Sequence, residues 1–81
     1  MSFTQQFVRV NTGGPDKEGC LLFDNDDALV AVLVRLSNQH DPEYAGKWFF
    51  EHGFGIRNYY GHPLFNNIVE AENWMTSRKF K

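Results

Sequence analysis

The residues best suited to chemistry are one cysteine and three histidines, at positions Cys20, His40, His52 and His62. Imidazole nitrogens and thiolates bind zinc, and a cysteine beside a histidine can act as a nucleophile with its base. No two of these residues have the close spacing of a ligand pair such as the histidines of HExxH. Cys20 begins the apolar run CLLF, where a cysteine is usually buried and unreactive. We therefore expect no metal site, no cofactor and no nucleophilic catalysis.

Carboxylates and glycine-rich segments offer the remaining routes to an enzyme. The acids within 24–27 and those at Glu43 and Glu51 are explained by helix capping and by an exposed helix face, so no acid–base role is indicated. The glycine-rich segments TGGPDKEG and GFG lack the spacing of phosphate-binding loops. Lys17 lies between Asp16 and Glu18, whose charges repel phosphate. The sequence thus predicts a protein that is not an enzyme.

The strongest candidate for a binding site is the stretch GFGIRNYYGHPLF, residues 53–65. Its rings and its arginine could stack on single-stranded nucleic acid, form a protein-contact hot spot, or fill the core. We expect Phe54, Ile56 and Phe65 to point inward. The predicted contact residues are Arg57, Asn58, Tyr59, Tyr60 and His62, with Trp48 and Trp74 as further anchors.

The charge balance favours a protein partner over nucleic acid. The net charge of −2 opposes binding to nucleic acid by bulk electrostatics. A nucleic-acid-binding regulator that uses Arg57 and the basic C-terminus (Arg78, Lys79, Lys81) is the alternative. The short chain and its aromatic excess are typical of small phage- or plasmid-borne proteins that bind a host protein. We expect a protein-binding module that acts as an inhibitor or adaptor.

Chain length sets the expected domain organisation and assembly. With 81 residues, positions 1–81 make a single compact domain with a thin stability margin. Small domains are typically stabilised by disulfides, a metal ion or a partner subunit. One cysteine cannot form an intrachain disulfide and no metal site is expected, so a partner subunit is the remaining source of stability and we expect a homodimer. No signal-peptide pattern and no apolar run near the ~18 residues of a membrane span is present, which favours the cytoplasm and no membrane contact.

The N-terminal third is predicted to be a β-hairpin. The alternation at Val8, Arg9 and Val10 indicates a strand over residues 3–10. Residues 11–19 hold the densest cluster of glycine, proline and aspartate, so they are expected to be a flexible loop. The run 20–23 returns as the second strand.

The rest of the chain is predicted to form three helices. Residues 24–40 show Leu29, Val32, Leu33 and Leu36 at the spacing of a buried helical stripe, with Asp24 or Asn25 as the N-cap. Residues 41–53 start with the Asp-Pro pair typical of a helix N-terminus. A third helix begins at Pro63, and residues 79–81 are expected to be a frayed tail. The predicted fold is therefore α+β, in the order β-β-α-α-α.

Overall fold

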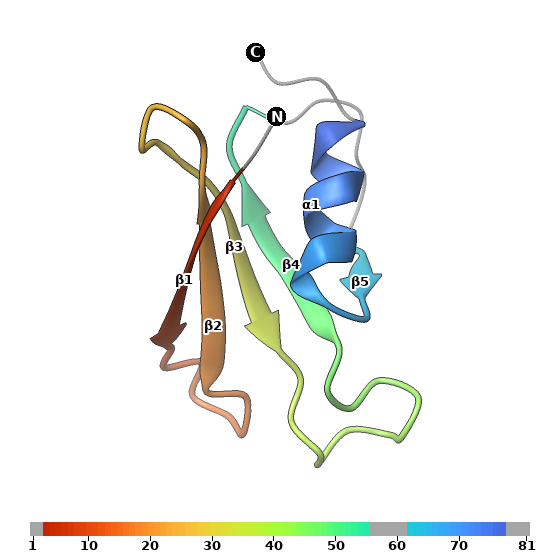
Figure 1. Cartoon of the computed structure of the whole chain (residues 1–81). Helices are drawn as coiled ribbons and strands as arrows, with labels where there is room; N and C mark the ends of the chain where they lie inside the picture. The colour runs from red at the N-terminus through yellow and green to blue at the C-terminus, as the bar shows by residue number, and fades with distance from the viewer. Residues whose placement is uncertain (1–2, 56–61, 78–81) are drawn as a thin grey trace.

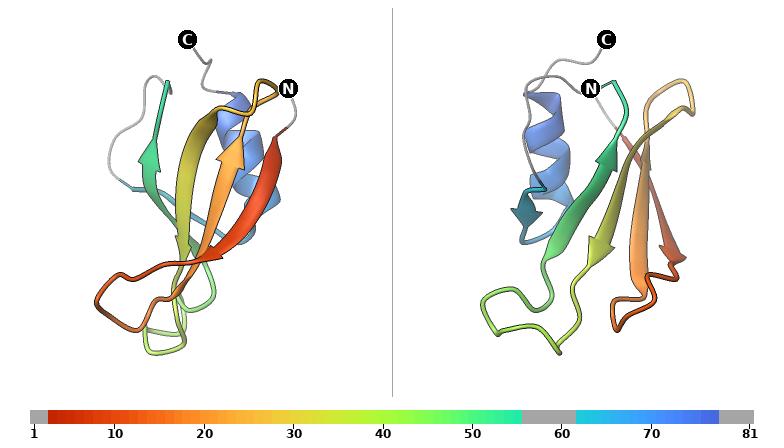
Figure 2. Two further views of the ribbon diagram at one scale, coloured as in Figure 1. Left: turned by 90° about the vertical axis from the view of Figure 1, so that its left-hand side faces the viewer. Right: turned by 180° about the vertical axis from the view of Figure 1, so that it is seen from behind.

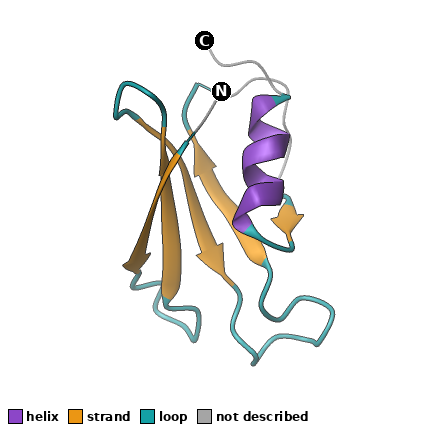
Figure 3. Cartoon of the chain, viewed as in Figure 1, coloured by secondary structure: helices purple, strands orange, loops and turns teal. Residues whose placement is uncertain are grey.

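A computed structural model of the chain describes residues 3–55 and 62–77. Within them lie five strands and one helix. In chain order they are β1 (Thr4–Arg9), β2 (Glu18–Phe23), β3 (Leu29–Arg35), β4 (Trp48–Gly53), β5 (Leu64–Phe65) and α1 (Ile68–Thr76) (Figure 1). The strands form one antiparallel sheet whose spatial order is the same as the sequence order (Figure 3).

The helix covers one face of this sheet. α1 lies against the side formed by β4 and β5, and no described element lies on the opposite face (Figure 2). Cross-strand partners point to the same face, so the register identifies the covered side. Cys20 pairs with Leu33 and Leu33 pairs with Phe50, and all three are fully buried. They form the core together with the buried stripe of α1, which is Ile68, Ala71 and Met75.

Local hydrogen bonds explain where α1 begins. The side chain of Asn67 accepts the backbone N–H of Glu70 at 2.9 Å, and the Glu70 carboxylate accepts the N–H of Asn66 at 3.0 Å. The first bond satisfies a donor that the helix N-terminus leaves free, and the second holds the residue before the N-cap against the first turn. The predicted third helix is thus present, but it starts at Ile68 because Leu64 and Phe65 pair with β4 instead.

The predicted β-β-α-α-α arrangement is wrong, because residues 24–40 form a turn and a strand. Val30, Val32 and Val34 are β-branched, and such residues favour strands over helices. The run LVAVLVR is apolar at nearly every position, so its spacing fits a helix and a strand with two apolar faces equally well. The acids before it belong to the β2–β3 turn, where the Asp24 side chain accepts the N–H groups of Asp26 and Ala28.

The predicted second helix is also wrong. The Asp41 carbonyl accepts the N–H groups of Tyr44 and Ala45, which makes a single turn after Pro42. The chain then passes through Gly46, whose φ of 81° is a left-handed value that ends a helix. The next residues form β4 and pair with β3. The N-terminal hairpin, by contrast, is confirmed by the pairing of β1 with β2.

Candidate functional site

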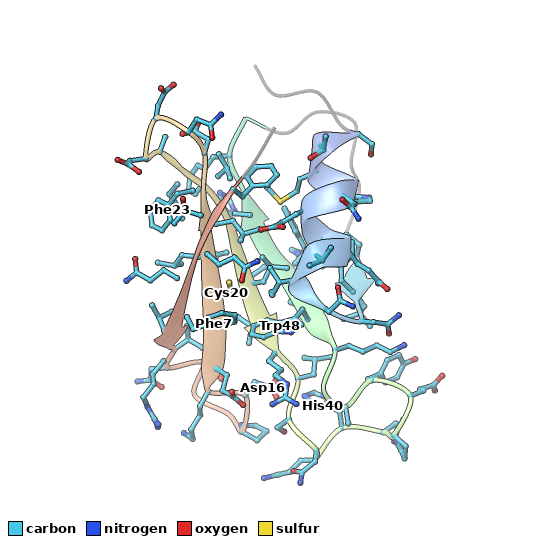
Figure 4. The ribbon with its side chains drawn as sticks, viewed as in Figure 1. Phe7, Asp16, Cys20, Phe23, His40 and Trp48 are labelled. Carbon is cyan, nitrogen blue, oxygen red and sulfur yellow. The ribbon has the colours of Figure 1, made fainter. Side chains whose placement is uncertain are left out.

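The uncovered face of the sheet carries apolar side chains from all five strands. The register aligns Val8, Gly19, Val34, Phe49 and Leu64 across the sheet, and Leu21 opposite Val32. Figure 4 shows Phe23 pointing away from α1, on the opposite side from Cys20. We call this surface the open face, and its apolar residues are Val8, Leu21, Phe23, Leu29, Val32, Val34, Phe49 and Leu64.

The open face is partly exposed and almost uncharged. Apart from Val34, which is 5% exposed, each of these apolar side chains is of intermediate exposure. Among the described strand residues that the register places on this face, none is Asp, Lys or Arg, and Glu51 lies at the bulge where β4 slips against β3. Single exposed apolar residues are common on proteins, but a contiguous patch of them typically marks an interaction surface.

His62, one of the predicted contact residues, borders the open face. Its ring stacks on that of Phe49, with centroids 5.0 Å apart and an angle of 16° between the planes. Its Nδ1 lies 2.8 Å from the carbonyl oxygen of Phe50, so the tautomer with hydrogen on Nδ1 donates to that oxygen. His62 therefore extends the aromatic surface of Phe49 at the edge of the sheet.

The two predicted tryptophan anchors lie on the covered side. Trp48 is 9% exposed, and its ring centroid is 6.0 Å from that of Phe7. Trp74 is half-buried on α1, with its ring 5.2 Å from Phe50 and 5.6 Å from Phe65. Both indoles therefore pack with the core.

The aromatic stretch divides differently from the expectation. Phe65 is buried as predicted, whereas Phe54 is 48% exposed, so its predicted inward position is wrong. Phe54 instead packs edge-on against His52, with centroids 4.6 Å apart. Ile56 and the predicted contact residues Arg57, Asn58, Tyr59 and Tyr60 lie outside the described residues.

Cys20 is placed for packing. It is fully buried on the covered face, and burial raises the pKa of its thiol to about 11. The thiol is therefore protonated at neutral pH and is a weak nucleophile. In the part of the chain that the structure describes, no three His, Cys, Asp or Glu side chains come close enough together to hold a metal ion.

A polar pair joins two loops at one end of the sheet. His40 Nε2 lies 3.0 Å from Oδ1 and 2.9 Å from Oδ2 of Asp16, and Asp16 Oδ1 accepts the N–H of Ser37 at 2.7 Å (Figure 4). Burial alone raises the pKa of Asp16, but the bonds from Ser37 and His40 outweigh it, and the net pKa lies below the ordinary value. We call this pair the loop clamp.

No local sequence pattern predicts the loop clamp, because Asp16 and His40 are 24 positions apart in the sequence. Only the strand order, which brings the β1–β2 and β3–β4 loops to the same end of the sheet, predicts their meeting. A hollow of about 320 Å³ lies beside the clamp, and its lining includes Ser37, Glu18 and Arg35. Arg35 is already paired with Glu18 at 3.1 Å, so its charge is partly neutralised there.

No protein-family model, no curated protein and no solved structure matches the chain. Across residues 3–55 and 62–77, α1 is too short to cross a membrane, and no other helix is present. The open face is therefore the feature of the described structure that most needs a functional explanation.

Proposed function

We propose that this protein is a small non-enzymatic protein-binding module of the cytoplasm, which acts as an inhibitor or adaptor, and that the open face is its contact surface. The observation that supports the proposal is the contiguous apolar surface of the open face. Among the described elements, α1 covers the other face of the sheet and none covers this one. Removing such surface from water favours association by roughly 25 cal/mol per Å² of apolar area.

The composition of the open face suits a protein partner. Phe23 and Phe49 supply large rings, and aromatic residues are enriched where interfaces are most tightly packed. Binding at the open face would remove water from no charged strand residue that the register places there, except Glu51 at the bulge. The described strands also present no Lys or Arg on this face, so it does not fit a phosphate backbone.

The partner element that best fits is an amphipathic helix. The covered face shows how this sheet accepts one, since α1 packs on it through Ile68, Ala71 and Met75. The open face offers the same kind of surface, with β-branched and aromatic side chains standing off a twisted sheet. A partner helix with its own apolar stripe would complete a three-layer arrangement, helix on sheet on helix.

The test compares capture of a partner by the wild-type protein and two charged variants. Tagged protein is incubated with lysate of its native host, with and without nuclease. Leu21→Asp places a charge at the centre of the open face, and Val69→Asp places one on the outer side of α1, where Val69 is 57% exposed. We expect a nuclease-resistant partner that Leu21→Asp loses and Val69→Asp retains, with circular dichroism confirming that both variants are folded.

Titration calorimetry with the purified partner sharpens the result. Burial of the open face predicts a negative heat-capacity change on binding. Capture that survives Leu21→Asp in a folded protein contradicts the proposal. Capture that nuclease abolishes, or that weakens steeply with salt, supports the nucleic-acid alternative instead.

A further inference from the structure

The two edges of the sheet differ in how their backbone groups are used. Along the outer edge of β4, Phe50 donates its N–H to the Pro63 carbonyl at 3.0 Å, and its own carbonyl accepts from His62. The strand beyond it, β5, is only two residues long. This edge is therefore short and partly closed, as protected sheet edges typically are.

The β1 edge is open. In the described part of the chain, β2 is the only strand that pairs with β1. The N–H of Val10 donates to the carbonyl of Lys17, one step beyond the aligned pair of Arg9 and Glu18. Hydrogen-bonded positions alternate along an antiparallel pair, so the even-numbered residues of β1 bond to β2. The N–H and C=O groups of Gln5, Phe7 and Arg9 therefore point outward.

Nothing within β1 guards this edge. Protected edges usually carry a proline, a bulge or a central charge, and the sequence TQQFVR has only a terminal arginine. Both register shifts lie in the β2–β3 and β3–β4 pairs. At the middle of the edge, Phe7 is 63% exposed although it lies on the covered side of the sheet. The Phe7 ring contacts Trp48 on one side and leaves apolar surface at the strand edge that a partner strand would cover.

We propose that two copies of this chain join through β1, antiparallel, about a two-fold axis at Phe7. The outward groups of Phe7 in each copy would then bond to each other, and Gln5 of each copy would lie opposite Arg9 of the other. The two exposed rings become a cross-strand aromatic pair, which stabilises antiparallel strands. The two sheets become one continuous sheet, and the two open faces become one surface.

The alternative centres of symmetry are less favourable. An axis at Arg9 would place two like charges opposite each other, which destabilises strand pairing. An axis at Gln5 would leave Arg9 beyond the end of the partner strand and would not bring the two Phe7 rings together. An axis at Gln6 or Val8 also lets the outward groups bond, but it would place Phe7 opposite Gln5 or Arg9 and would form no ring pair. The self-complementarity of the strand about Phe7 is thus the reason for choosing a second copy as the occupant. This inference does not depend on the proposed function, because it requires no other protein.

The first test measures association and amide exchange on the wild-type chain alone. Sedimentation equilibrium is expected to show reversible conversion from the 9.4 kDa chain to twice that mass as concentration rises. In hydrogen exchange by NMR, the amides of Gln5, Phe7 and Arg9 should gain protection as the dimer forms. The amides of Gln6 and Val8 bond to β2 in either state, so they serve as an internal control.

The second test uses matched variants. Phe7→Lys places two like charges at the axis and should weaken the dimer about tenfold or more. Phe54→Lys changes another exposed ring, which directly follows β4, three strands away from β1 in the sheet, and should leave the dimer intact. Gln5→Pro removes an outward N–H without removing a backbone bond to β2, so it should weaken the dimer while the hairpin stays folded. It also removes the bond from Gln5 Nε2 to Glu72, so Gln5→Ala, which loses only that side-chain bond, is its control and should keep the dimer.

Three results would overturn the inference. One is a chain that stays monomeric up to millimolar concentration. Another is a dimer that persists in folded Phe7→Lys and Gln5→Pro with rapid exchange at the odd-numbered amides of β1. The third is a dimer that Leu21→Asp abolishes and Phe7→Lys does not, which would show that the copies meet through the open face.

Discussion

Phe49 and Phe50 are neighbours in sequence and lie on opposite faces of the sheet, and their environments differ sharply. Phe50 is fully buried, with its ring 6.5 Å from Phe65 and 5.2 Å from Trp74. Phe49 is half-exposed on the open face and stacks on His62. Residue type is identical at the two positions, so the presence of α1 on one side decides which ring belongs to the core.

The largest expected difference in stability is between alanine substitutions at these two positions. Phe50→Ala should lower the free energy of unfolding by about 3–5 kcal/mol, because it leaves a cavity among side chains that cannot collapse fully. Phe49→Ala should cost about 1 kcal/mol, because water already reaches its ring. Urea denaturation of both variants measures the difference. Equal losses would show that the open face is buried in solution.

A smaller loss of stability is expected at Gly19, where β1 and β2 are closely packed. A Cβ added at Gly19 would lie 2.7 Å from Val10 Cγ1 and 3.3 Å from the Leu33 carbonyl oxygen. Gly19→Ala should therefore destabilise the fold by about 2 kcal/mol. Gly14→Ala is the control, since the nearest atom to its Cβ would be 3.8 Å away. Thermal unfolding of the two variants compares them directly.

The packing of α1 on the covered face can be destabilised by a substitution in the helix alone. Asn67→Ala removes the N-cap of α1 and should cost about 1 kcal/mol. Asn73 lies on the exposed side of the same helix, and Asn73→Ala should change stability little. Urea unfolding followed by far-ultraviolet circular dichroism measures the stability of both variants. A larger loss for the Asn73 variant would contradict the role of Asn67 as the cap.

The smallest expected effect concerns the loop clamp, which belongs to neither face. The folded state lowers the pKa of Asp16, so its contribution to stability is fully present above the unfolded pKa of about 3.9. That contribution is lost as pH falls through the folded pKa. Wild type should exceed Asp16→Asn in stability at neutral pH, and the gap should shrink below about pH 4. A constant gap from neutral pH to pH 2 would show that the charge of Asp16 does not stabilise the loops.

The parts of the fold that the sequence predicts correctly are those with local signals. The hairpin of β1 and β2 surrounds a dense cluster of turn residues, and α1 has both a cap and an amphipathic stripe. The strand β3 has no comparable signal, because its leucines satisfy the helical period while its valines satisfy alternation. Its three valines favour the strand, because β-branched side chains fit a pleated sheet better than a helix.

The candidate site was less predictable than the fold. The sequence pattern predicts a strand at Leu21 and a helix at Val32, so it does not place the two residues on one surface, where the register pairs them. The sequence predicts His62 as a contact residue, and its position beside Phe49 depends on the pairing of β4 with β5. A contact surface built from cross-strand neighbours becomes visible only when the register is known.

Because the strands neighbour one another in sequence order, the sheet needs no crossover connection to assemble. Each hairpin can form on the microsecond scale and serve as the template for the next strand. Contacts between nearby sequence segments keep the contact order low for a β-rich chain, so we expect folding to be fast relative to most sheets of this size. The helix comes last in the chain, and its buried stripe packs in one core with the aligned Leu33 and Phe50.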